Sequence, residues 1–574
     1  MTSTTRDKIP THLRKYIVSQ DYARYTTEDQ AVWRFILRQL RDFLSRHAHP
    51  VYLEGLKKTG ITVDRIPSID QIDEHLEHLD WGAVPVSGFI PPAAFMEFQS
   101  LGILPIASDM RTLDHIGYTP APDIVHEAAG HAPILADPNY SAYLRLYGDV
   151  ARNAILSRED LKQYEAIRLL SDIKEDPRST AQDIQKAERE LEEINASIKN
   201  ISEAALLSRM NWWTAEYGLV GKLSSPRIFG AGLLSSVGES RHCLEGGVRK
   251  IPLSVDCVQV AYDITEPQPQ LFVAEDFAHL GDVLDQLAEQ MAFRIGGVEG
   301  LQKAVTAGTV NSVELDTGIQ ISGVIKAFLV DDEGSPAYLQ FEGPSQLSYE
   351  RRELNGQGRS RHAHGYSTPV GPLKNSDLEQ LAKNARVGHE LDLQYQSGVH
   401  VQGRVSATLH RDGRLIMVTL QNCRVLRGSQ VLFDPSWGEY DMAIGESVRK
   451  VFGGAADREA YGDSEDFVAA RVPMKDYTPQ QQTLHTLFAR IRDLRERSRA
   501  EAENREIFNS LLTSYFNDAP STWLPGVELL ELSHHLKMND ESRRPLIQKL
   551  QDIQSANDRL AEEIADGIRL AGVE

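Results

Sequence analysis

The chain is poor in cysteine and has no long apolar runs. Only three of its 574 residues are cysteines, Cys243, Cys257 and Cys423. An odd number of widely spaced cysteines provides no disulfide framework and is typical of a reducing compartment. No stretch approaches the roughly 18 consecutive apolar residues that a transmembrane helix needs, and the polar, basic N-terminus lacks the apolar region of a signal peptide. We therefore expect a cytoplasmic protein.

Basic residues are also in the minority. The sequence has 61 Lys and Arg against 82 Asp and Glu, a formal net charge of −21, which disfavours non-specific binding to nucleic acid or to anionic membranes. With 41% hydrophobic and 25% charged residues, the composition is that of a globular chain of about two to four domains. We expect neither a nucleic-acid partner nor a membrane partner.

One segment, YTPAPDIVHEAAGHAPILADPNY at 118–140, has two histidines, His126 and His131, with Glu127 between them. Its apolar flanks indicate burial, where imidazoles without partners are costly and a bound divalent metal would remove that cost. The spacing is i, i+5 instead of the i, i+4 of H-E-x-x-H zinc proteases, so on a regular α-helix the side chains would diverge by about 140°. Binding one metal therefore requires a local bend or bulge, which Gly130 would permit.

A second segment, NWWTAEYG at 211–218, offers the third ligand. Glu216 is a lone acid in this aromatic, apolar run, and a buried carboxylate without a partner is unfavourable. Two neutral histidines and one carboxylate leave about three positions open on a metal, as in the non-haem Fe(II) oxygenases. The expected metal ligands are therefore His126, His131 and Glu216, and the expected chemistry is that of O2.

These residues resemble a known family, the pterin-dependent aromatic amino acid hydroxylases, and are most like its phenylalanine 4-hydroxylases. The resemblance rests on YTPAPDIVHEAAGHAP at 118–133, WWTAEYG at 212–218 and FGAGLLSSVGE at 229–239. It covers about residues 60–300, so the chain looks like a long bacterial-type form with an extra C-terminal region. The resemblance implies Fe(II) and tetrahydrobiopterin or a related tetrahydropterin as cofactors, with O2 as co-substrate. It implies ring hydroxylation of an aromatic amino acid, with phenylalanine converted to tyrosine as the favoured reaction.

The resemblance also assigns residues to the substrate and to the pterin. Arg111 lies fifteen residues before His126, at the family position that binds the substrate carboxylate, and its guanidinium has the forked geometry for that role. Asp123 matches a residue that orients the site. The implied substrate-binding residues are Arg111, Thr119, Pro122, Trp212, Tyr217 and Ser235. The implied pterin-binding residues are Gly88, Ile90 and Phe95, with Glu127 acting through water.

One position departs from the family. Asn211, directly before Trp212, stands where the family has an aromatic residue near the pterin. We expect this difference to alter the pterin geometry and to leave the three metal ligands untouched.

Periodicity and composition divide the chain into four parts. Residues 1–60 read as an N-terminal helical segment, and 61–305 as a mainly α catalytic domain of the aromatic amino acid hydroxylase type, with a helical hairpin inserted at about 155–205. Residues 306–445 alternate between apolar and polar and predict a small all-β module without an internal repeat, whose role is unknown. Residues 446–574 predict a helical C-terminal region. Helical segments of this kind also offer surfaces for a homo-oligomer.

Two other functions stay open on the residues alone. A zinc hydrolase would use Glu127 as general base, although the i, i+5 spacing disfavours it. A non-catalytic relative would keep the metal as a stabilising element and bind a partner through its C-terminal half. The identity of the metal separates the first from a hydroxylase, and pterin-dependent turnover separates the second.

Overall fold

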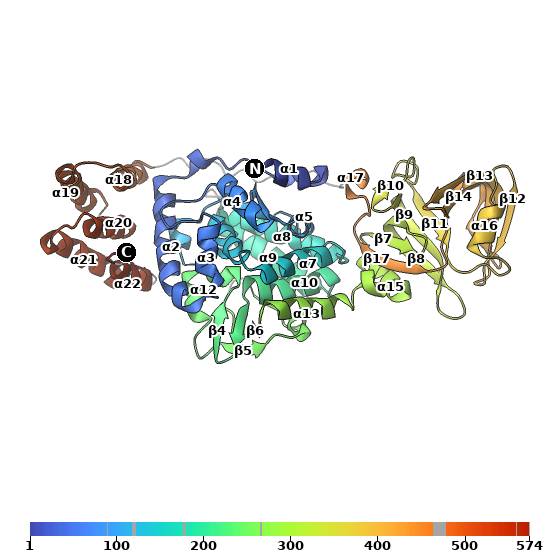
Figure 1. Cartoon of the computed structure of the whole chain (residues 1–574), viewed down its shortest axis with the longest axis horizontal. Helices are drawn as coiled ribbons and strands as arrows, with labels where there is room; N and C mark the ends of the chain where they lie inside the picture. The colour runs from blue at the N-terminus through green and yellow to red at the C-terminus, as the bar shows by residue number, and fades with distance from the viewer. Residues whose placement is uncertain are drawn as a thin grey trace.

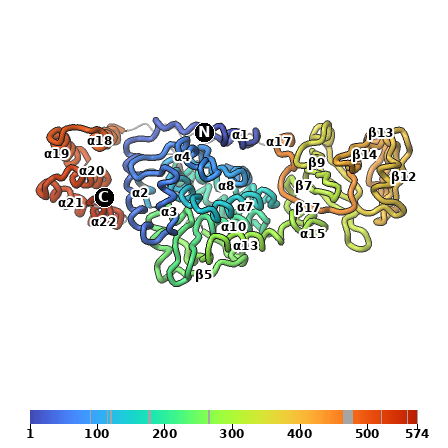
Figure 2. Tube along the Cα trace, viewed as in Figure 1, coloured from blue at the N-terminus to red at the C-terminus, as the bar shows by residue number. Residues whose placement is uncertain are grey.

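The computed structural model of the protein describes residues 1–572 except residue 89 and the segments 118–121, 176–178, 264–266, 463–477, 520 and 558–559. The molecule is elongated (Figure 1). Helices of the C-terminal region lie at one end, the helical N-terminal half is in the middle, and two β units extend from the other end. The tube view shows the same order, with the C-terminal helices beside the N-terminal half (Figure 2).

The N-terminal half is mainly helical, and its longest helix is α2 (Thr27–His47). This helix begins with a capping box between Thr26 and Asp29, which satisfies two backbone N–H groups at its start. Its apolar face, with Trp33 and Leu40, is fully buried.

The other helices here are α1 (Ser3–Lys8), α3 (Val51–Lys58), α4 (Ile69–Leu76), α5 (Pro92–Ser100), α6 (Ala132–Ile134), α7 (Pro138–Ala151), α10 (Glu203–Asn211), α11 (Ala231–Leu234), α12 (Val237–His242), α13 (Phe277–Ala288), α14 (Ala292–Ile295) and α15 (Gly297–Ala307). The short 3-10 helices of the chain are η1 (Thr11–Tyr16), η2 (Tyr22–Arg24), η3 (Glu77–Leu79), η4 (Leu113–His115), η7 (Val255–Gln259) and η8 (Pro435–Trp437).

Two small sheets complete this half, so its fold mixes helices and strands. One sheet pairs β1 (Gly82–Val86) in parallel with β2 (Ile103–Ala107). Parallel strands end at the same edge of a sheet, so the segment after β1, with Gly88, lies beside the segment after β2, with Arg111. The other sheet has the order β4-β3-β6-β5, with β4 at Ser225–Ile228, β3 at Leu219–Lys222, β6 at Gln270–Ala274 and β5 at Arg249–Pro252.

The inserted segment contains α8 (Arg158–Glu175) and α9 (Ala181–Ser197), which pack against each other. A capping box between Thr180 and Asp183 begins α9. Residues 176–178, between α8 and α9, lie outside the described residues. Much of both helices faces solvent, so the insertion lengthens the chain between the two metal-binding motifs without entering their core.

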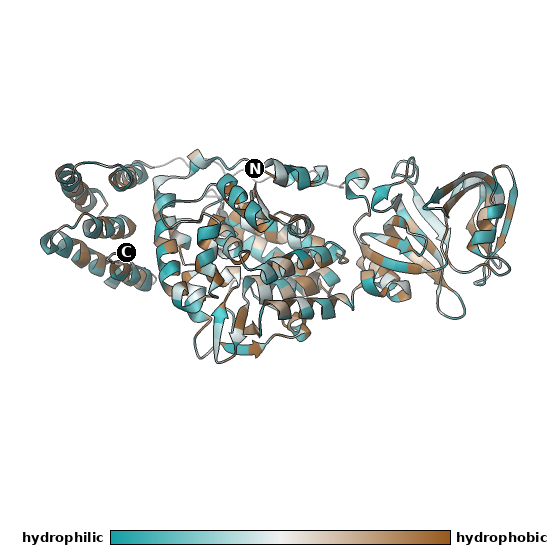
Figure 3. Cartoon of the chain, viewed as in Figure 1, coloured by the Kyte–Doolittle hydropathy of each residue, from teal (hydrophilic) through white to brown (hydrophobic). Residues whose placement is uncertain are grey.

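Beyond residue 309 the chain forms two sheets with separate apolar cores. Hydrophobic and hydrophilic residues alternate along many of the strands (Figure 3), as in β12, where only alternate residues are buried. The first sheet has the order β10-β9-β8-β7-β17 with β11 paired to β9, and the second has β12-β13-β14-β15 with β16 paired to β14. The strands are β7 (Val310–Leu315), β8 (Ile319–Val330), β9 (Pro336–Tyr349), β10 (Arg352–Glu353), β11 (Gly365–Pro369), β12 (Glu390–Gln394), β13 (Val399–Arg411), β14 (Arg414–Arg427), β15 (Gln430–Phe433), β16 (Tyr440–Ala443) and β17 (Val448–Gly453).

The first two strands of each sheet, β7 and β8 in one and β12 and β13 in the other, repeat at a step of 80 residues. Val313 pairs with Ile321 in the first unit, and Leu393 pairs with Val401 in the second; 313 to 393 and 321 to 401 are both steps of 80. Every residue pair between β7 and β8 has such a counterpart between β12 and β13. The β-bulges recur as well, between 322 and 324 in one unit and between 402 and 404 in the other.

The expectation of a module without an internal repeat is therefore wrong. The residues shared at a step of 80 are few, chiefly the turn glycines Gly318 and Gly398 and the strand glycines Gly323 and Gly403. The turn glycines have φ of 89° and 81°, which favours glycine. At other positions different apolar residues occupy the same place in the apolar–polar alternation, so the repeat is visible only in the pairing of the strands. The region also includes the helix α16 (Leu378–Asn384) and the short 3-10 helix η8, and so is not wholly β.

The strand β17 falls within the part predicted to be helical, 446–574, yet it pairs with β7 and completes the first sheet. The helices that follow are α17 (Arg458–Tyr461), α18 (Pro479–Glu496), α19 (Glu501–Asp518), α20 (Leu524–His535), α21 (Asp540–Ser555) and α22 (Ala561–Leu570). None of the described helices is long and apolar enough to span a bilayer. The three cysteines are buried and free.

The C-terminal helices share one apolar core with α2 and are also joined to it by buried charges. Arg34 on α2 donates from Nε and Nη2 to the two carboxylate oxygens of Glu528 on α20, at 2.9 and 2.6 Å. Arg495 on α18 reaches both Glu528 and Glu531, at 3.3 and 2.9 Å. Burial alone would raise the pKa of Glu528, but Arg34 and Arg495 lower it, so the carboxylate stays ionised. The ion pairs thus fix the C-terminal helices to the N-terminal half.

Replacing Glu528 by glutamine should destabilise the full-length protein by about 3–5 kcal/mol, because it leaves the buried Arg34 without its counter-charge. Urea unfolding followed by circular dichroism measures this loss. The matched control is Glu501→Gln, which breaks an exposed i, i+4 pair with Arg505 and should change stability little. Equal stability of the two variants would contradict the anchoring role of Glu528.

Glu97 on α5 connects the N-terminal segment with the chain beyond the β units. Its carboxylate lies 3.1 Å from His12 Nε2 and 2.8 Å from Arg458 Nη1. Burial alone would raise the pKa of Glu97, but the His12 and Arg458 contacts outweigh it and lower the pKa to about 2.

The stabilisation from Glu97 should be complete above pH 4.5, its ordinary pKa, and should disappear as the pH falls towards 2, because protonation then breaks both pairs. We expect the wild type to lose up to about 3 kcal/mol more than Glu97→Gln over this interval. Urea titrations at several pH values, with exposed Glu190→Gln as control, measure the difference. Parallel pH profiles for wild type and Glu97→Gln would refute this assignment.

Candidate metal centre

The two histidines of the first motif lie on a π-helical turn, Val125–His131. Backbone hydrogen bonds in a π-helix join residues five apart, so the i, i+5 spacing brings both imidazoles to one face, with ring centroids 5.0 Å apart. The local bulge expected from the spacing is therefore present. A Cβ on Gly130 would lie only 2.7 Å from the carbonyl oxygen of Ala231, so glycine lets α11 approach this turn.

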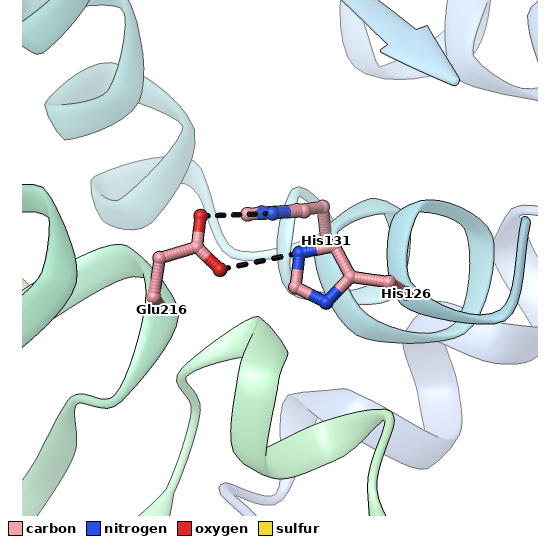
Figure 4. Close-up of side chains that lie close together, drawn as sticks. All are labelled: His126, His131 and Glu216. Atoms are coloured by element: carbon pink, nitrogen blue, oxygen red, sulfur yellow. Dashed lines mark ion pairs between the residues drawn. The ribbon is translucent and has the colours of Figure 1, made fainter. Parts of the chain in front are cut away.

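Glu216 ends a second π-helical turn, Trp212–Glu216, which continues α10. Its Oε2 lies 3.2 Å from His126 Nε2, and its Oε1 lies 3.3 Å from His131 Nε2 (Figure 4). The ligand atoms of the three residues all lie within 4.8 Å of one another. His131 is buried, whereas the His126 and Glu216 side chains are each 17% exposed, so the group can be reached from outside.

The charges at this group suit a divalent cation. Burial alone would raise the pKa of Glu216, but His131 and His126 lower it below its usual range, so the carboxylate is ionised beside two imidazole nitrogens. Among the described residues, this is the one such group of side chains whose ligand atoms converge. Two imidazoles and a carboxylate are a donor set for iron or zinc, so these residues fit a metal.

Ser235 and Asp123 hold the first histidine. The Ser235 hydroxyl lies 3.1 Å from His126 Nδ1, which leaves Nε2 facing Glu216. Asp123 accepts the backbone N–H of His126 at 3.0 Å. These contacts fix the ring in the way that metal-binding histidines are commonly oriented.

Arg111 is tied to the same two residues. Its Nε and Nη2 donate to Asp123 at 2.7 and 2.8 Å, and its Nη1 donates to the Ser235 carbonyl at 3.2 Å. Burial alone would raise the pKa of Asp123, but Arg111 lowers it. A guanidinium has five N–H donors, and these bonds use three of them.

The remaining residues expected at the substrate fall into three groups. Trp212 stacks on Tyr217 with ring centroids 4.5 Å apart, which forms an aromatic wall beside Glu216. Pro122 is half-buried and directly precedes Asp123. Thr119 lies outside the described residues.

The residues expected at the pterin lie on the loop after β1, on α5 and on the first π turn. Gly88 has a φ of 59° and donates its N–H to Asp109 at 3.2 Å. Ile90 is buried in an apolar cluster against which Phe95 packs. Burial raises the pKa of Glu127 to about 8 despite the opposing effect of His131.

Three features of the site were not found from the sequence. Tyr262 stacks on Trp212 at 4.3 Å, but its segment has no recognisable motif. Asp109, which binds Gly88, could be found only from the parallel pairing of β1 and β2. Asn211 donates from Nδ2 to Glu216 Oε1 at 3.3 Å, so the expectation that it leaves the metal ligands untouched is wrong. Its five-residue distance from Glu216, equal to that of the two histidines, was the available signal.

Comparisons with known proteins agree with the site. The family model of the biopterin-dependent aromatic amino acid hydroxylases matches residues 5–154 and 182–296. A phenylalanine-4-hydroxylase of Mesorhizobium japonicum is 29% identical over 271 residues, which cover 46% of this chain and 82% of the relative. One of Chromobacterium violaceum is 25% identical over 307 residues, covering 51% and 88%.

Solved structures of phenylalanine hydroxylase from Chromobacterium violaceum are also similar. One of them, with bound iron(III) and oxidised cofactor 7,8-dihydrobiopterin, is 24% identical with a TM-score of 0.38 and covers 50% of this chain and 92% of that one. The match to the family and its curated relatives defines the class of protein as an aromatic amino acid monooxygenase. Residues 5–154 and 182–296 match the family model of the biopterin-dependent aromatic amino acid hydroxylases, in agreement with the resemblance seen in the sequence.

Removing the carboxylate of Glu216 should abolish tight metal binding. Substitution of outer residues at metal sites typically costs about 10–100-fold in affinity, so loss of a ligand should exceed about 100-fold. Equilibrium dialysis of Glu216→Ala against Fe(II), with metal analysis, measures the loss. Glu193→Ala on the exposed face of α9 is the control, and unchanged circular dichroism shows that the β units remain folded. A Glu216→Ala variant that retains one tightly bound ion would refute the ligand assignment.

Proposed function

We propose that the protein is a phenylalanine 4-monooxygenase that uses Fe(II), a tetrahydropterin and O2 to convert phenylalanine to tyrosine. The observation that carries this proposal is the convergence of His126, His131 and Glu216 within 4.8 Å in the part of the chain that matches the family. The curated relatives of this part are phenylalanine-4-hydroxylases, which supports phenylalanine over other aromatic amino acids.

The role of the three ligands is to hold the metal on one face and leave its other face accessible. His126, His131 and Glu216 would bind Fe(II), and the bound iron and pterin together supply the activation of O2 and the transfer of oxygen to the ring. The chain itself binds and orients the substrate and the cofactors, and it excludes water. Burial of His131 and Glu127 keeps water from the inner side of the metal centre.

Substrate orientation rests on Arg111 and the aromatic wall. Asp123 and the Ser235 carbonyl fix the guanidinium, so its two remaining N–H groups are directed without further loss of side-chain freedom. They suit the carboxylate of an amino acid. The flat faces of Trp212 and Tyr217 suit its aromatic ring, which places the ring beside the metal ligands.

The pterin would bind on the loop after β1 and on α5. Gly88 and Ile90 offer backbone groups to the heterocycle, and Phe95 offers a ring for stacking. Glu127 has one carboxylate oxygen, Oε2, that is buried and has no hydrogen-bond partner. A water-mediated contact from this carboxyl group to the pterin would satisfy it.

Two further parts of the proposal concern the whole chain. A cytoplasmic location is supported by three cysteines that are buried and free. Assembly into a homo-oligomer through helical segments is supported by exposed leucines of the inserted hairpin, Leu161 and Leu169. The expected domain limits at about 60 and 305 belong to the proposal as well, whereas the pairing of β17 with β7 extends the β-rich region beyond 445.

The deciding experiment is anaerobic reconstitution of the full chain with Fe(II), followed by O2 and each aromatic amino acid in turn, with and without tetrahydrobiopterin. We expect tyrosine from phenylalanine, only when the pterin is present. Glu216→Ala is the inactive control. Bound iron without any product would favour a metal-stabilised scaffold with a partner-binding C-terminal half, and hydrolysis by a zinc-loaded protein would favour a hydrolase with Glu127 as base.

A further inference from the structure

We propose that Asn211 is a positioning residue that fixes the carboxylate of the metal ligand Glu216. The inference rests on the proposed metal function and adds to it a residue of this chain that departs from the family pattern. Asn211 is the last residue of α10, and its Nδ2 lies 3.3 Å from Glu216 Oε1. A carboxylate only accepts hydrogen bonds, so the side-chain amide must present its NH2 group to it.

The bond arises from the second π turn. Asn211 and Glu216 are five residues apart, like His126 and His131, and π-helical hydrogen bonding brings residues at this spacing to one face. The next residues repeat the relation, because Trp212 and Tyr217 stack at 4.5 Å and the Tyr217 N–H donates to the Trp212 carbonyl at 2.8 Å. The π turn therefore has two successive cross-turn side-chain contacts, one at the metal ligand and one at the aromatic wall.

Asn211 also makes the two oxygens of Glu216 inequivalent. Oε2 faces His126 Nε2, whereas Oε1 faces His131 Nε2 and also accepts the amide of Asn211. Among the described residues, Asn211 is the hydrogen-bond partner of this carboxylate outside the two histidines. Without it, the carboxylate would be held only by groups that must also bind the metal. The amide is neutral, so it orients the carboxylate without adding charge to the centre.

The two sides of the metal centre are therefore oriented by different residues. His126 is oriented by Ser235 and by Asp123, and Glu216 is oriented by Asn211. Loss of the amide should leave the three ligands present but the carboxylate free to rotate. Outer residues of this kind typically contribute about 10–100-fold to metal affinity.

The test is Co(II) titration of metal-free full-length protein, followed by visible absorption, for wild type, Asn211→Leu and Asn211→Ala. Leucine keeps the approximate shape of asparagine but donates no hydrogen bond, and alanine is the most favourable helix residue, so at least one variant should fold. Both should bind Co(II) about 10–100-fold more weakly and with shifted absorption bands. Asn195→Leu, at an exposed position of α9, is the matched control and should bind as the wild type does.

The outcomes separate this inference from the proposed function. If wild type binds Co(II) and folded Asn211 variants bind it with the same affinity and spectrum, Asn211 has only a structural role and the inference fails while the metal centre stands. If wild type itself binds no Co(II), the metal centre fails and the inference fails with it. Weaker binding and altered bands in the variants, with a normal Asn195→Leu, support the inference.

Discussion

The structure depends on one constraint, the need to place a partly buried carboxylate between two imidazoles. Glu216 reaches His126 and His131 at 3.2 and 3.3 Å, and both contributing segments have a π turn. Regular α-helices would direct the two histidines apart. The local cost of these rare turns is offset by the tight packing around them, as in the contact of Gly130 with Ala231.

The same constraint joins the metal ligands to the residues expected at the substrate. Asp123 binds both the backbone of His126 and the guanidinium of Arg111, and Ser235 contacts both side chains as well. Binding of an amino acid carboxylate at Arg111 would therefore act on the residues that orient His126. Arg111 and His126 are thus parts of one hydrogen-bonded network, so a change in the orientation of either side chain should alter that of the other.

The sequence was sufficient to predict that His126, His131 and Glu216 come together, because such side chains are unfavourable without partners in an apolar segment. Two imidazoles in an apolar segment and the lone Glu216 each required a partner, and the spacing of the histidines required a bulge. The contact of Asn211 depends on a π turn in the second motif. That motif contains only one expected ligand, so no spacing between ligands indicates the turn. The β repeat was missed for another reason, because alternation specifies only which face a residue occupies, and the two units share few identities beyond glycines such as Gly318 and Gly398.

Buried charged residues join the C-terminal helices to the N-terminal half, and this burial is not evident from the sequence. Arg34 and Glu528 resemble surface residues in a sequence, yet both are buried because each is the other's partner. A further pair of contacts, from Arg241 on α12 to Glu562 and Asp566 on α22, attaches the last helix next to the segment that begins at Ser235. Ser235, which contacts both Arg111 and His126, is the C-cap of α11 and lies two residues before the start of α12, so the C-terminal helices contact the helix that directly follows this serine. They are thus part of the frame that holds the metal centre, although they lie outside the family match.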